Sequence, residues 1–383
     1  MKNRYLSLDV FRGATVALMI LVNNPGSFTE MYSPLAHAHW EGCTFADLVF
    51  PFFLFAVGNA MAFALPSLKE KSRTVFFVKI FKRAIIIFII GLLLNWSPFV
   101  KWEHDQLIFK AWQNVRIFGV LQRIAICYFF ASLLIYFFDG IKLLLISLFL
   151  LALYWLMCYS LGEGSAPYSL EGFFGTNIDI QLVGLDHIYK GNKIPFDPEG
   201  LVSTLPAITQ VIFGYIAGRI IISKGKNYAM ITRLNFIGML LIAAGAIWAL
   251  FFPLIKNIWS SSYVIYTTGI AVVVICILIF LIELKNLKGA ATTFFDVFGK
   301  NALFIFVISG LLPRVLNIIR IDAGVNDKGE KIFLSPQGWM YKYVLRGISE
   351  NPQFGSFLYS LLFLMLFWTI GYVLYRKKIY IKV

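Results

Sequence analysis

Apolar residues follow one another along most of the chain in runs of roughly 20, and polar residues gather between these runs. About 20 apolar residues are what a helix needs to cross the hydrocarbon core of a bilayer. Lipid offers no hydrogen bonds to the backbone, so each run predicts a membrane-spanning helix. We expect one all-α, polytopic membrane domain over residues 1–383. Its expected spans number about ten: 5–23, 45–66, 75–95, 117–138, 143–161, 202–222, 230–252, 259–282, 292–312 and 356–375.

Composition supports this prediction and excludes a soluble protein. Hydrophobic residues make up 59% of the chain and charged residues 14%, whereas soluble domains carry about 25% charged residues. The net charge of +14 would suit a nucleic-acid partner, but the basic residues are dispersed among the loops between spans, so we expect none. The four cysteines form no paired motif, which argues against a disulfide framework and against a metal site.

The distribution of charge predicts how the chain is oriented. With the N-terminus in the cytoplasm and the loops assigned to alternate sides, the cytoplasmic side holds 20 of the 34 Lys and Arg residues but only four of the 20 acids. Short cytoplasmic loops are rich in Lys and Arg, so we expect both termini in the cytoplasm. Lys2 and Arg4 imitate a signal peptide, but Asp9 and Arg12 interrupt the apolar run after them, and we expect a retained first helix.

The loops assigned to the outer side are long and hold all four histidines, His37, His39, His104 and His187. Long loops are functional more often than they are mere connectors. The first outer loop and the helix after it bring His37, Asp47 and amide side chains close to one membrane face. Histidine titrates near neutral pH and can accept a proton from an attacking amine or hydroxyl. The alternative is that these residues only cap helices and anchor the loop.

Four further groups of polar residues lie within or beside the expected spans. Asp9 and Arg12 are three residues apart on one helix, which predicts an ion pair, although Arg12 could instead extend to the inner surface. Arg123 lies about two turns inside its span, where it needs a partner. The acids around Asp197 either belong to a site or form a helix entry. The aromatic residues near Trp259 would equally suit the membrane interface.

The residues that could take part in chemistry fall in seven segments: 7–13, 37–51, 116–123, 186–189, 197–200, 257–263 and 299–301. Taken together, these segments resemble the transmembrane heparan-α-glucosaminide N-acetyltransferase family and its bacterial relatives. Two departures stand out: the large N-terminal luminal domain of the lysosomal member is absent, and Phe118 replaces a proline that is usual in the fourth-span motif. The resemblance runs from the first helix to the ninth.

This resemblance implies that acetyl-CoA gives its acetyl group, from the cytoplasm, to the amine of a glucosamine-type sugar on the far side of the membrane. His37 matches the family's catalytic histidine and Asn23 an active-site asparagine, and we expect Asp47 to position His37. The residues expected to bind the cofactor are Asp9, Arg12, Arg123, Lys300 and Asn301. The residues expected to bind the sugar are Trp40, Asp197, Glu199, Trp259 and Ser260.

Several alternatives stay open. The acetyl group either passes directly from the thioester to the amine, which we favour, or rests on His37 first. An amino-sugar transporter and an O-acetyltransferase acting on a cell-envelope glycan are the competing functions. The resemblance also implies a homodimer. The absence of a luminal domain and of targeting signals predicts a multi-pass protein in the lipid bilayer of a bacterial inner membrane.

Overall fold

The computed structural model describes residues 5–103, 105–164, 166–191, 194–325 and 331–381. His104, one of the four outer-loop histidines, lies outside these residues. Helices dominate the described chain, and the two β-hairpins are short. The α-helices are α1 (Leu6–Asn23), α2 (Phe45–Lys69), α3 (Arg73–Trp96), α4 (Val120–Phe137), α5 (Gly140–Ser160), α6 (Gly175–Val183), α7 (Thr204–Lys224), α8 (Tyr228–Trp248), α9 (Ser261–Leu278), α10 (Ala290–Lys300), α11 (Ala302–Leu316), α12 (Pro336–Met340) and α13 (Pro352–Arg376).

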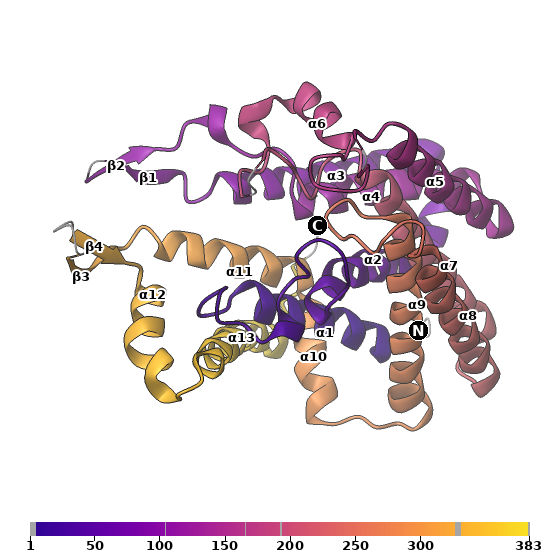
Figure 1. Cartoon of the computed structure of the whole chain (residues 1–383). Coiled ribbons are helices and arrows are strands. Elements are labelled where there is room, and N and C mark those ends of the chain that lie inside the picture. The colour runs from indigo at the N-terminus through magenta and orange to yellow at the C-terminus, as the bar shows by residue number, and fades with distance from the viewer. Residues whose placement is uncertain (1–4, 104, 165, 192–193, 326–330, 382–383) are drawn as a thin grey trace.

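Shorter elements lie mostly in the connecting loops. The strands β1 (Val100–Glu103) and β2 (Gln106–Phe109) form one antiparallel hairpin, and β3 (Ile321–Val325) and β4 (Lys331–Leu334) form the other. Both hairpins project from the same side of the bundle (Figure 1). The indole Nε1 of Trp102 in β1 donates at 2.8 Å to the carbonyl oxygen of Ile318, which lies between α11 and β3. The remaining short helices are η1 (Ser33–Leu35), η2 (Trp112–Asn114), η3 (Leu185–His187), η4 (Ile279–Leu284), η5 (Tyr341–Leu345) and η6 (Arg346–Ile348).

The all-α membrane fold is confirmed. Among the described residues, eight helices are long and apolar enough to cross a membrane, and a ninth span arises if the bent pair α10–α11 is counted as one. The third expected span, α3, is 24 residues long but carries Lys79, Lys82 and Arg83 in its first half, and it is not among the eight. The helix boundaries agree with the expected spans to within a few residues.

The expected span 292–312 is wrong as a single helix. The chain bends by 78° between α10 and α11, at Asn301. The Asn301 side chain donates to the Ile379 carbonyl at 3.0 Å and accepts from the Ile381 amide at 2.8 Å. An asparagine that bonds backbone outside its own helix favours a break at that position.

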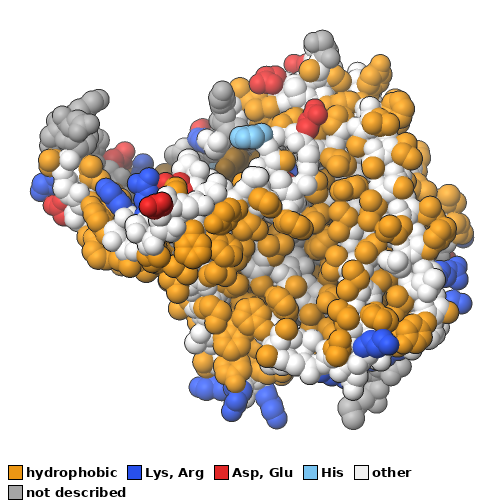
Figure 2. All heavy atoms as spheres, turned by 60° about the horizontal axis from the view of Figure 1, so that its bottom comes forward, with side chains coloured by type: hydrophobic (Ala, Val, Ile, Leu, Met, Phe, Trp, Pro, Cys, Tyr) orange, Lys and Arg blue, Asp and Glu red, His pale blue; other side chains and the backbone are white. Residues whose placement is uncertain are grey.

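The two ends of the bundle differ in their side chains. Asn23 closes α1 and Asp47 lies in the first turn of α2 at one end, which we call the histidine end because His37 is there. Arg12 near the start of α1 and Lys69 at the end of α2 lie at the other, basic end. Figure 2 shows Lys and Arg without neighbouring acids along the lower and right margins, and acids and a histidine in the upper half, where further Lys and Arg lie at the left. A broad hydrophobic surface lies between the two.

Close approach of α1 to α10 brings polar side chains together at the basic end. A Cβ added at Gly299 would lie 2.2 Å from the Asp9 carbonyl oxygen, and one at Gly13 would lie 1.8 Å from the Phe295 carbonyl oxygen. Only glycine leaves room for backbones this close. The contact places the start of α1 against the end of α10. Packing of α1 against α13 as well brings both ends of the chain into one bundle.

Candidate active site

The start of α2 is built around one carboxylate. Thr44 is the N-cap and Asp47 the third residue of the helix, the spacing of a capping box. Asp47 Oδ2 accepts from the Thr44 amide at 3.1 Å, from the Thr44 hydroxyl at 3.0 Å and from the Ala38 amide at 3.0 Å. Asp47 is only 1% exposed. These bonds fix the carboxylate and draw the segment around residue 38 against the helix.

His37 lies on the other oxygen of this carboxylate. Its Nδ1 is 2.8 Å from Asp47 Oδ1, and 47% of its side chain is exposed. An ionised carboxylate only accepts hydrogen bonds, so Asp47 favours the tautomer with the proton on Nδ1 and a lone pair on Nε2. A histidine oriented in this way by a carboxylate can act as a general base. The expected contact between Asp47 and His37 is therefore present.

A cavity of about 140 Å³ opens beside His37. We call it the histidine cavity. Asn23, Glu199 and Lys256 contribute its other polar lining, and its walls are otherwise apolar residues of α1, α2, α4 and α11. Asn23 and His37 thus share one cavity although they come from a helix end and from the loop after it. An amide that can donate a hydrogen bond, here Asn23, and a base, here His37, line the same small cavity. This arrangement suits acyl transfer.

Sequence reasoning missed Lys256. Its Nζ lies 3.2 Å from Asp47 Oδ1 and 2.9 Å from His37 Nδ1, and its side chain is 22% exposed. Burial lowers the pKa of the Lys256 ammonium, against the opposing effect of the Asp47 carboxylate. The only signal in the sequence was a lysine in a short outer loop, where the positive-inside pattern expects few cations.

Glu199 is the one expected sugar-binding residue that lines the histidine cavity. It forms an ion pair with Arg116, whose guanidinium also binds Asp197 through Nε to Oδ2 at 2.9 Å. Burial raises the pKa of Glu199, but the nearby Arg116 charge outweighs it and leaves the pKa below the ordinary value. Glu199 is therefore a carboxylate at neutral pH. Asp197 is 2% exposed, and its carboxylate accepts hydrogen bonds from the Arg116 guanidinium and from the Glu199 amide.

Arg123 lies apart from the other expected cofactor residues. It is 1% exposed, and its Nη2 donates to Ser203 Oγ and, at 3.2 Å, to the Gly200 carbonyl. Its guanidinium lies 5.0 Å from the centre of the Trp259 ring, a distance typical of cation–π contacts. The partner of this buried arginine is thus an aromatic face and a loop, not a carboxylate. Its role towards a cofactor stays a prediction.

Three of the expected sugar-binding residues, Trp40, Trp259 and Ser260, are not among the residues that line the histidine cavity. Trp40 donates its indole N–H to the Tyr168 carbonyl at 2.9 Å and packs against Phe196. Trp259 is 1% exposed. Ser260 caps α9 and donates to the Pro253 carbonyl at 2.7 Å. Direct contact of these residues with a substrate stays a prediction.

The basic end brings four expected cofactor residues together. Arg12 binds Asp9 at 2.8 Å and the Gly299 carbonyl oxygen at 2.9 Å, which confirms the expected ion pair. Lys300 Nζ lies 2.8 Å from Asp9 Oδ2 and 2.6 Å from Asp296 Oδ1. Asn301 follows directly at the helix break. The close packing of α1 on α10 therefore assembles a charged cluster from segments nearly 300 positions apart.

A second cavity, of about 340 Å³, lies at this end. We call it the basic cavity. Arg12, Arg83 and Lys300 contribute its cations, and Phe53 lies in the walls of both the basic cavity and the histidine cavity. One aromatic side chain of α2 thus stands between a cationic cavity at one end of the bundle and the imidazole at the other.

Comparison with known proteins finds a matching family and curated relatives of the chain. Residues 4–256 match the family model of the heparan-alpha-glucosaminide N-acetyltransferase catalytic region. The whole chain is 26% identical to heparan-alpha-glucosaminide N-acetyltransferase of Mus musculus, covering 61% of that protein. Identity to the Homo sapiens protein is also 26%, over 99% of this chain and 60% of the relative. The chain thus spans about three-fifths of the length of the curated relatives it matches.

Proposed function

The chain belongs to the heparan-α-glucosaminide N-acetyltransferase catalytic family, and we propose that it is a membrane-embedded acetyltransferase. In this proposal the acetyl donor is acetyl-CoA, which enters from the cytoplasm at the basic end. The acceptor is the amine of a glucosamine-type sugar at the histidine end. The observation that carries the proposal is that His37, which is bonded to Asp47, lines a cavity that Asn23 also lines.

The basic cavity suits the donor's charge. CoA carries phosphates, and Arg12, Arg83 and Lys300 supply cations at its walls. Acetyl-CoA bound there would place its diphosphate near these cations and direct its pantetheine arm along α2, past Phe53. The thioester would then reach the histidine cavity from one side of the membrane while the sugar approaches from the other.

The chemical step follows from the groups around the histidine cavity. The sugar amine attacks the thioester carbonyl carbon, and His37 Nε2 takes the proton that the nitrogen loses as the C–N bond forms. Asn23 and Lys256 donate to the oxyanion of the tetrahedral intermediate. When the C–S bond breaks, the imidazolium returns the proton to the departing thiolate. Asp47 remains ionised and keeps His37 in the required tautomer. We favour this direct transfer because a thioester already reacts with a positioned amine.

Reconstituted protein tests the proposal. Proteoliposomes receive radiolabelled acetyl-CoA and glucosamine, and both free CoA and the labelled sugar are measured. Release of CoA together with an N-acetylated sugar is the expected result. Uptake of sugar without CoA release would contradict the proposal and favour a transporter, and label on a sugar oxygen would favour an O-acetyltransferase.

The assembly and location of the protein belong to the same proposal and rest on the family resemblance. We propose a homodimer in a bacterial cytoplasmic membrane. Light scattering of the purified protein in detergent would measure the mass of the assembly. A single protomer there would contradict the homodimer and leave the chemistry untouched.

A further inference from the structure

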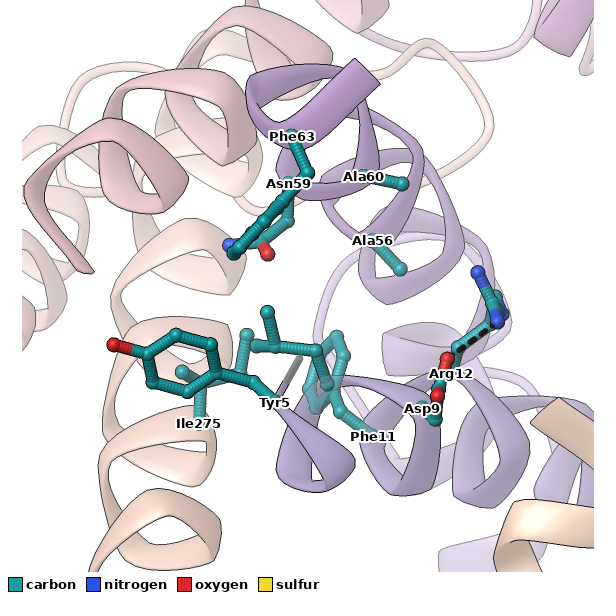
Figure 3. A pocket seen from close by; sticks show the side chains of 10 residues that line it. Tyr5, Asp9, Phe11, Arg12, Ala56, Asn59, Ala60, Phe63 and Ile275 are labelled. Carbon is teal, nitrogen blue, oxygen red and sulfur yellow. Dashed lines mark hydrogen bonds and ion pairs between the residues drawn. The ribbon is translucent and has the colours of Figure 1, made fainter. Parts of the chain in front are cut away.

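A third cavity, of about 320 Å³, lies between α1, α2 and α9 (Figure 3) and takes no part in the chemistry above. We call it the side pocket. Asn59 of α2 lies in its wall and is 2% exposed. Within the described part of the chain, neither the oxygen nor the nitrogen of the Asn59 amide has a hydrogen-bond partner. Figure 3 shows this amide above Tyr5 and Phe11, across the space that separates α2 from α1.

An unsatisfied buried amide is costly, because both its donor and its acceptor have been taken out of water. The acyl chain of a lipid would fill the side pocket without relieving that cost. A ligand that offers a donor and an acceptor side by side would relieve it. The side pocket therefore favours a polar ligand at Asn59.

The remaining walls favour a flat ring. Tyr5, Phe11 and Phe63 contribute aromatic surface, and the ring centres of Tyr5 and Phe63 lie 6.0 Å apart in an edge-to-face contact. The Tyr5 hydroxyl is occupied, since it donates to the Ile221 carbonyl at 3.2 Å. Aromatic walls bind the faces of a nucleobase. The amide of an asparagine matches the edge of adenine, which carries an amino donor next to a ring-nitrogen acceptor.

The position of the side pocket fits the nucleotide end of a donor. Arg12, Ala56 and Ala60 line both the side pocket and the basic cavity, so the two share a wall. Asn59 is 12 positions after Asp47 on α2, which is about 18 Å at 1.5 Å per residue. By ordinary bond lengths the two amides of pantetheine lie within about 10 Å of the sulfur. A thioester at His37 therefore leaves the pantetheine amides short of Asn59.

We propose that the side pocket binds the adenine ring of the donor and that Asn59 recognises the edge of that ring. The proposal rests on acetyl-CoA being the donor. CoA then extends through three cavities: the thioester in the histidine cavity, the pantetheine and phosphates in the basic cavity, and the base beside Asn59. Asn59 would thus distinguish CoA from donors that lack the nucleoside.

The test compares two donors, acetyl-CoA and acetyl-4′-phosphopantetheine, on the wild type and on Asn59→Leu. Leucine keeps the volume and removes only the amide, so we expect no loss of thermal stability. We expect the KM for acetyl-CoA to rise about tenfold, as loss of roughly one hydrogen bond predicts, with kcat within about twofold. The KM for acetyl-4′-phosphopantetheine should be the same in both proteins.

Gln210→Leu is the matched control. Gln210 is another fully buried amide, outside the side pocket. Its Nε2 donates to the Thr268 hydroxyl at 3.0 Å, and its Oε1 has no hydrogen-bond partner among the described residues. This substitution should leave the KM for both donors unchanged. An unchanged KM for acetyl-CoA in Asn59→Leu, or an equal rise for both donors, would overturn the assignment.

A binding measurement separates this proposal from the proposed activity. Wild-type protein that releases no CoA from acetyl-CoA would contradict the enzymatic function alone. Calorimetry with 3′,5′-ADP as the probe would then still test the side pocket. A Kd for 3′,5′-ADP that is about tenfold higher in Asn59→Leu than in the wild type supports the site. Equal Kd values for the two proteins would contradict it.

Discussion

At the scale of single residues, His37 is the side chain on which the proposed chemistry depends most. Removal of a general base costs about 10²–10⁴-fold in rate, so we predict that His37→Ala abolishes measurable transfer. Half of the His37 side chain is exposed, and we expect expression and melting temperature to stay at wild-type values. Acetyl transfer in proteoliposomes measures the first effect. His39→Ala, two residues away and exposed, is the control and should remain active. Near-normal activity of His37→Ala would remove this histidine from the mechanism.

Lys256 offers a second prediction at this scale. If it donates to the oxyanion, Lys256→Met lowers kcat about 10²-fold, the cost of removing one such donor. The KM for acetyl-CoA should change little, because Lys256 lies at the opposite end from the basic cavity. Steady-state kinetics separate the two constants. Lys190→Met, at an exposed lysine paired with Asp186, serves as the comparison. A rise in KM with unchanged kcat would instead make Lys256 a binding residue.

At the scale of elements, the junction between α6 and α7 carries a pH dependence. Burial raises the pKa of Asp179 to about 6. The backbone amides of Leu201 and Val202 donate hydrogen bonds to its carboxylate and lower the pKa, but burial has the larger effect. The folded pKa lies above that of an unfolded aspartate, about 4. Folding therefore favours the protonated carboxyl group. The protein is most stable below about pH 4, where Asp179 is protonated in both states, and it loses this stability as the pH rises through 6 and the folded protein has to ionise a buried group.

We predict that the wild type loses up to about 3 kcal/mol of stability between pH 4 and 8 from this group. Asp179→Asn keeps an oxygen for the two amides and has no proton to lose, so its melting temperature should lack this step. Thermal unfolding in detergent at several pH values measures the difference. Asp186→Asn changes an exposed acid in the neighbouring turn and should retain the wild-type step. Identical profiles for wild type and Asp179→Asn would contradict the prediction.

The break between α10 and α11 gives another prediction for an element. Asn301 makes two hydrogen bonds to the segment after α13, one to Ile379 and one to Ile381. We predict that Asn301→Ala destabilises the protein by about 1–3 kcal/mol. The last residues should also become open to carboxypeptidase and to hydrogen exchange. Unchanged protection of this segment would mean that other contacts hold it.

At the scale of the whole molecule, Phe53 stands between the two ends. We predict that Phe53→Trp lowers turnover with acetyl-CoA about tenfold, because a larger ring narrows the passage past α2. Phe149→Trp, on the lipid-exposed surface of α5, should have no effect. Turnover with saturating sugar measures both variants. Wild-type turnover in Phe53→Trp would place the route of the pantetheine elsewhere.

Much of this molecule could be predicted from its sequence because the bilayer restricts what apolar runs can form. The spans followed from hydropathy, and the histidine end followed from residue types gathered between 23 and 47. Lys256 could not be found in this way, because a loop residue reaches Asp47 only through the packing of distant helices. The break at Asn301 also escaped prediction, since its cause is a hydrogen bond to residues 379–381 that no local pattern records.

The Asp47 carboxylate makes two kinds of contact: it completes the capping box at the start of α2, and it orients His37. A turn that frays at the end of a helix opens more easily than the fold as a whole. Heating would therefore release the imidazole from its partner before the bundle unfolds. The temperature at which activity is lost would lie below the melting temperature, and it would report the opening of this single turn.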